Sequence, residues 1–64
     1  MILQKIIRRE YEDTKFIYLC DYDEVQQLKE KYNNRTYWYE NYISNVTPIE
    51  NFMFLVTINE PYKD

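Results

Sequence analysis

The chain has 64 residues, enough for one domain that buries only about 60% of the surface exposed by its unfolded form. It has no glycine, no histidine and a single cysteine, Cys20, which excludes glycine-rich phosphate loops, an internal disulfide and the usual zinc sites. Its net charge of −3 and pI of about 4.8 argue against direct nucleic-acid binding.

The first half of the chain predicts a β-hairpin. Residues 2–11 hold Ile2, Leu3, Ile6 and Ile7 among polar residues, a β-prone run that favours a strand, with a short helix as the alternative. Residues 16–22 are dense in aromatic and β-branched side chains and form the second predicted strand. We expect residues 12–15 to make a tight turn between them.

A helix is predicted to follow the hairpin. Asp21 or Asp23 can cap it, because each has Glu24 or Gln26 three residues later, as a capping box requires. One apolar stripe recurs at helical spacing, and it consists of Val25, Leu28 and Tyr32. Residues 33–34, both asparagine, are expected to end the helix.

The second half predicts two more strands. Residues 36–43 are heavily aromatic, residues 44–50 with Pro48 form a loop, and residues 52–58 are apolar enough for a central strand. Pro61 ends this strand, and residues 62–64 form a loose tail. The expected fold is a single α+β domain over residues 1–64 with ββαββ order, in which one helix covers one face of a four-stranded, mostly antiparallel sheet.

A turn at residues 12–15 would sort the hairpin into two faces. Ile2, Ile6, Ile17 and Leu19 would share one side and seat the helix. The other side would carry Tyr11, Phe16, Tyr18, Cys20 and Tyr22 with nothing to cover it. An exposed apolar patch of this kind marks an interaction site. The alternatives are that these rings pack into a two-sided core or form a homodimer interface.

Charge points to the same region. Residues 1–9 carry +3, whereas residues 10–24 carry six acids against Lys15, a net −5. Acidic and aromatic side chains together suit a basic protein surface, including one that holds nucleic acid in a nucleic-acid-binding enzyme. Helix capping is the alternative explanation for Asp21, Asp23 and Glu24. The predicted partner-binding residues are Tyr11, Glu12, Asp13, Tyr18, Tyr22, Asp23 and Glu24.

The sequence favours binding over catalysis. Without histidine it lacks the usual general base at neutral pH, and Cys20 lies in a predicted strand with no partner to activate it. We expect no catalytic residue, no metal and no cofactor. Charges begin within five residues of the N-terminus and no apolar run could span a bilayer, so we expect a cytoplasmic protein with no membrane partner.

In size and composition, the small, acidic, tyrosine-rich and glycine-free chain resembles phage-encoded inhibitors, anti-CRISPR proteins among them. The resemblance covers the whole chain without a shared motif, so it transfers no functional residue. It implies action in a bacterial host cell, where the protein would block a basic nucleic-acid-binding or active-site surface of its target. A homodimeric structural or regulatory module and an antitoxin-like binder of a basic toxin remain alternatives.

Overall fold

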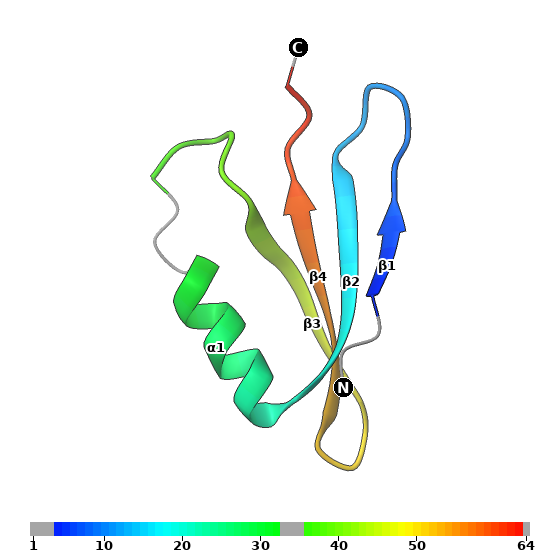
Figure 1. Cartoon of the computed structure of the whole chain (residues 1–64), viewed down its shortest axis with the longest axis vertical. Coiled ribbons are helices and arrows are strands. Elements are labelled where there is room, and N and C mark those ends of the chain that lie inside the picture. The colour runs from blue at the N-terminus through cyan, green and yellow to red at the C-terminus, as the bar shows by residue number, and fades with distance from the viewer. Residues whose placement is uncertain (1–3, 33–35, 64) are drawn as a thin grey trace.

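The computed structural model describes residues 4–32 and 36–63. The elements follow the order β1 (Gln4–Ile7), β2 (Thr14–Asp21), α1 (Tyr22–Tyr32), β3 (Tyr42–Glu50) and β4 (Met53–Glu60). The strands form one antiparallel sheet in the order β1-β2-β4-β3, with α1 lying across one face (Figure 1). The predicted ββαββ domain of the α+β class is confirmed, and so is the central position of the last strand.

The helix begins where the sequence predicts it. Asp21 accepts a hydrogen bond from the Glu24 backbone N–H at 2.8 Å, and Glu24 accepts one from the Asp21 N–H at 3.1 Å. This reciprocal pair is a capping box, so of the two predicted caps Asp21 is the one used. The helix extends to Tyr32; the asparagines predicted to end it lie outside the described residues.

The first and third strands differ most from the sequence prediction. In the described part of the chain the first strand stops at Ile7, so the connection to β2 is the longer segment 8–13 rather than a turn at 12–15. The third strand was predicted at residues 36–43 with a loop at 44–50, but it spans Tyr42–Glu50, and residues 36–41 form the loop. Pro48 is tolerated because β3 is an edge strand with bulges, where a missing N–H breaks no interior pairing.

The helix covers the face opposite to the predicted one. Ile6 pairs with Phe16, so the aliphatic grouping of Ile6 with Ile17 and Leu19 is wrong. The side chains beneath α1, here called the covered face, are Phe16, Tyr18, Cys20, Ile43, Val46, Phe54, Val56 and Ile58. Val25 of α1 packs in one buried cluster with Cys20, so the helix lies on the side to which Cys20 points. The predicted stripe Val25, Leu28 and Tyr32 does meet the core there.

Candidate functional site

The seven predicted partner-binding residues do not form one patch. Residues 11–13 precede β2 and residues 22–24 follow it, and an eight-residue strand at about 3.3 Å per residue separates the two groups by roughly 25 Å. Figure 1 accordingly shows the β1–β2 loop and the start of α1 at opposite ends of the molecule. Tyr18 lies between them on the covered face, where it packs against the core.

Asp13 holds a polar network together. Its carboxylate accepts hydrogen bonds from the Tyr62 backbone N–H at 3.0 Å and from the Asn59 side-chain amide at 3.5 Å. Asn59 is only 7% exposed, and its amide also bonds the Tyr42 hydroxyl at 3.3 Å and accepts from Ser44 Oγ at 2.8 Å. The network connects the β1–β2 loop to β3, β4 and the C-terminal segment. Tyr62, predicted to belong to a loose tail, is thus bound through its backbone.

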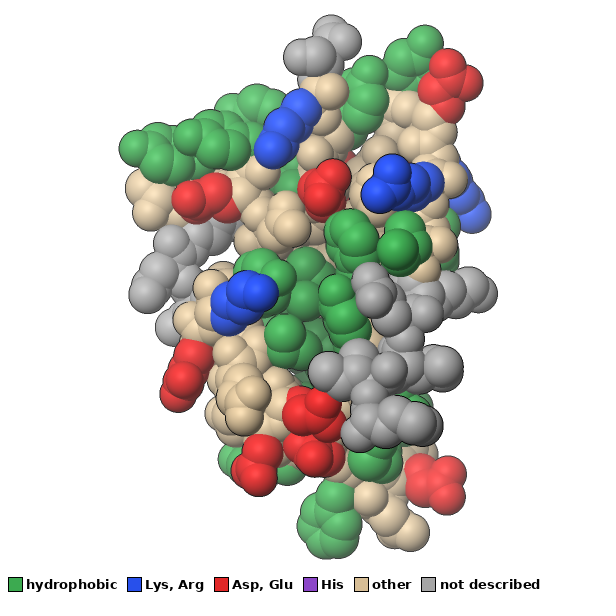
Figure 2. All heavy atoms as spheres, in the orientation of Figure 1, with side chains coloured by type: hydrophobic (Ala, Val, Ile, Leu, Met, Phe, Trp, Pro, Cys, Tyr) green, Lys and Arg blue, Asp and Glu red, His purple; other side chains and the backbone are tan. Residues whose placement is uncertain are grey.

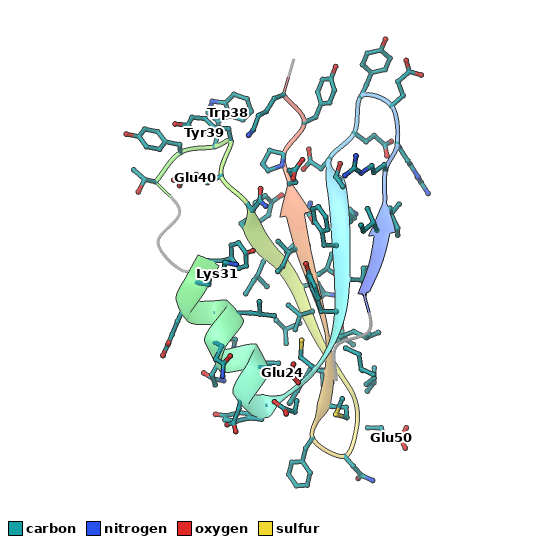
Figure 3. The ribbon with its side chains drawn as sticks, in the orientation of Figure 1. Glu24, Lys31, Trp38, Tyr39, Glu40 and Glu50 are labelled. Atoms are coloured by element: carbon teal, nitrogen blue, oxygen red, sulfur yellow. The ribbon has the colours of Figure 1, made fainter. Side chains whose placement is uncertain are left out.

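Five exposed aromatic side chains gather at this end of the sheet, and we call them the aromatic end: Tyr11, Tyr37, Trp38, Tyr39 and Tyr62. Tyr11 is 73% exposed and Trp38 65%. They come from three segments far apart in the sequence, which the fold brings to the same end (Figure 3). The rings of Tyr11 and Tyr62 meet edge to face at 5.9 Å between centroids.

The loop that carries three of these rings is held by its own acid. The Glu40 carboxylate accepts hydrogen bonds from the backbone N–H groups of Thr36 and Tyr37 at 2.6 and 3.0 Å, and the Glu40 N–H bonds the Tyr37 carbonyl at 3.1 Å. Tyr37 and Tyr39 stack in parallel at 5.2 Å, and Trp38 stands edge-on to Tyr39. The Lys63 ammonium lies 5.6 Å from the Tyr39 centroid. The loop therefore presents its rings in a fixed arrangement.

Sequence reasoning missed this loop because consecutive aromatics resemble a strand. Tyr37, Trp38 and Tyr39 all have high strand propensity, which reflects packing on a sheet rather than a backbone requirement. The available signal was the asparagines on both sides, at residues 33–34 and 41, since asparagine favours turns.

The opposite end of the molecule carries Tyr22, Asp23 and Glu24 of the predicted set. Tyr22 is exposed, and its ring lies 6.4 Å from that of Phe54. Glu24 serves the capping box, which confirms the capping explanation for Asp21 and Glu24. Exposed Phe52 and Glu50, not predicted as site residues, lie at the neighbouring β3–β4 turn.

The reactive groups of the described residues include one cysteine and the surface carboxylates. Cys20 is fully buried, and burial raises the pKa of its thiol, with further increases from Glu24 and Asp21. A protonated, inaccessible thiol is a poor nucleophile. Within the described ranges, no three His, Cys, Asp or Glu side chains converge as metal ligands would. An open groove of about 520 Å³ between α1 and β3 is lined by Gln26, Lys29, Glu30, Tyr32, Tyr42 and Ile43.

Comparisons with known proteins leave the family open. No protein-family model, curated protein or solved structure matches the chain. The described residues include no helix long and apolar enough to cross a membrane.

Proposed function

We propose that this protein is a non-enzymatic binding protein whose aromatic end makes the main contact with a partner protein. The observation that carries the proposal is the convergence of Tyr11, Tyr37, Trp38, Tyr39 and Tyr62, all exposed, from three separate segments. Tyrosine and tryptophan are the residues most enriched among the side chains that dominate binding energy. Each buries a large ring at low entropic cost while its polar atom remains able to hydrogen-bond.

Pre-organisation supports the same function. The Glu40 carboxylate already fixes the backbone that presents Tyr37 to Tyr39, and Asp13 already fixes the backbone of Tyr62. A surface ordered before binding loses less conformational entropy on association than one that orders on contact.

The proposed action is occlusion of the partner surface. The net charge of −3 over the whole chain attracts the protein to a partner with a basic surface, such as a nucleic-acid-binding enzyme, and the bound protein would exclude the anionic ligand of that partner. The resemblance to phage-encoded inhibitors in size and composition agrees with this action. Part of the proposal is that the protein acts in the cytoplasm of a bacterial host, where a free cysteine stays reduced.

The only tryptophan of the chain provides the test. Partners captured from a bacterial lysate and identified by mass spectrometry would be titrated into the protein while Trp38 fluorescence is followed. We expect a blue shift as the exposed indole is buried. Trp38→Ala and Tyr39→Ala should each weaken binding about 30-fold, the equivalent of about 2 kcal/mol, while leaving the thermal unfolding midpoint nearly unchanged.

Gln27→Ala is the control, because Gln27 is exposed on α1 away from both ends. A partner that binds tightly without changing Trp38 fluorescence, and that binds Trp38→Ala as tightly as the parent chain, would refute the aromatic end as the contact surface. Self-association that is lost in Trp38→Ala, with no foreign partner, would assign the surface to a homodimer and refute the proposed partner.

A further inference from the structure

A second exposed apolar group lies at the end of the molecule opposite the aromatic end. The two-residue turn Asn51–Phe52 joins β3 to β4 next to the start of α1 (Figure 1). Phe52 is 84% exposed, the highest value among the large apolar side chains that the structure describes, and Ile49 and Tyr22 are also exposed here. We call this group the acidic end; its exposed members are Asp21, Tyr22, Asp23, Ile49, Glu50 and Phe52.

Phe52 occupies its position at a cost to the fold. Its φ is 65°, in the left-handed region that suits glycine or asparagine and disfavours a bulky side chain. Its neighbour Asn51 is the residue type that adopts this conformation most readily after glycine, yet the strained position holds the phenylalanine. Because the ring is so exposed, its burial contributes little to the stability of the domain. Its position is therefore better explained by a contact outside the chain.

Acidic side chains surround this apolar tip. Asp21 pairs with Met53, and Met53 pairs with Glu50, so the two carboxylates lie on either side of Met53 in one row across three strands. Residues 19–28 and 47–56, which build this end, contain no lysine or arginine. Figure 2 shows acidic side chains around the green tip at this end, whereas the Lys and Arg side chains visible in this view lie in the middle and toward the other end.

We propose that the acidic end is a second contact surface, and that its partner is a basic protein segment whose apolar side chains pack against the Phe52 ring. Lysine or arginine in that segment would face Asp21, Asp23 and Glu50, while its apolar side chains would cover the ring. Nucleic acid and anionic lipid are repelled by these carboxylates, and a second acidic end carries the same charge. This surface is distinct from the aromatic end of the proposed function, so the protein can contact one partner at two places or link two partners.

The probe is a short synthetic peptide of arginine and leucine, with a counterpart in which glutamate replaces arginine. We expect only the arginine peptide to bind, with affinity that falls as salt rises because the Debye length is about 8 Å at physiological ionic strength. Amide shifts in an NMR titration should concentrate in residues 20–24 and 49–54. Trp38 fluorescence should not change, since the only tryptophan lies at the other end.

Phe52→Asn separates this role from a structural one. Asparagine relieves the left-handed strain, so the free protein should gain about 4–8 °C in Tm, while peptide affinity should fall about tenfold or more as the ring is lost. Glu50→Gln and Asp23→Asn should each weaken binding of the arginine peptide severalfold and leave the fold intact. Glu30→Gln, which removes one acid from the last turn of α1, is the matched control and should have little effect.

The proposal fails if Phe52→Asn lowers Tm, because the ring would then belong to the fold. It also fails if Phe52→Asn binds the arginine peptide as tightly as the parent chain, or if the shifts map to the aromatic end. Trp38→Ala should bind the arginine peptide as tightly as the parent chain. The peptide experiment can therefore refute the acidic end without refuting the proposed function, and loss of partner binding at the aromatic end can be tested without the peptide.

Discussion

Within residues 4–32 and 36–63, the two residues with left-handed backbone are both aromatic. Tyr11 has a φ of 64° and Phe52 one of 65°, and each is exposed at a turn at its own end of the molecule. A chain without glycine must place other residues at such positions, but asparagine or aspartate would do so at lower cost. Both turns are therefore less stable than they would be with asparagine, and in each the residue responsible belongs to one of the two proposed surfaces.

The buried thiol of Cys20 predicts that the stability of the fold depends on pH. Because burial raises the pKa of its thiol in the folded state, the thiol contributes stability that is fully present below its unfolded pKa of about 8.5 and is lost as pH rises through the folded pKa. The midpoint of urea unfolding should therefore fall more for the parent chain than for Cys20→Ala between about pH 7 and about pH 10. All other side chains are the same in the two proteins, so their contributions cancel in the comparison. An equal fall in the two would show that the thiol pKa is not raised.

The capping box at the start of α1 predicts how substitutions at Asp21 and Asp23 change the stability. Asp21→Ala removes the acceptor for the Glu24 N–H and should cost about 1 kcal/mol in the free energy of unfolding. Asp21→Asn keeps an acceptor and should cost much less. Asp23→Ala removes an acid from the first turn without touching the cap, so its loss should stay at a few tenths of a kcal/mol. Urea unfolding measures all three, and a larger loss for Asp23→Ala than for Asp21→Ala would place the cap at Asp23.

Elements whose signal is local could be predicted from the sequence. The capping residues and the Val25, Leu28 and Tyr32 stripe define α1, and the apolar run of β4 defines a central strand. The partner of Ile6 could not be predicted, because pairing it with Phe16 depends on the length of the connection after β1, and a shift of one residue moves a side chain to the other face. Tyr18 packs against the core because α1 covers the face that Tyr18 shares with Phe16 and Cys20, and no local pattern in β2 indicates which face the helix takes.

The candidate site is a property of the whole molecule, which is why sequence reasoning found only part of it. Tyr11 was predicted, but Tyr37, Trp38, Tyr39 and Tyr62 join it only because two loops and the C-terminal segment meet at one end of an antiparallel sheet. The acids predicted to share its patch are divided by the length of β2. Local patterns identify the residue types of a surface, while strand order decides which of them meet.

The network around Asn59 supports the aromatic end, and Asp13 is its link to Tyr62. Asp13→Ala leaves the amide of a 7% exposed asparagine without one partner and frees the Tyr62 N–H, so it should cost about 1–3 kcal/mol in the free energy of unfolding. Asn59→Ala should also destabilise the protein. Because the two residues share the network, the double variant should lose less than the two single losses added, with a coupling of about 0.5–3 kcal/mol.

Asp13→Ala should also affect partner binding. Without Asp13, the Tyr62 ring is no longer held beside Tyr11, so contact through the aromatic end should weaken in Asp13→Ala. The arginine peptide should still bind at the acidic end, since β2 separates the two. The measurements are urea unfolding of the four proteins in the cycle and both binding titrations of Asp13→Ala. Unchanged stability with weakened partner binding would instead make Asp13 a direct contact residue, as its sequence position first indicated.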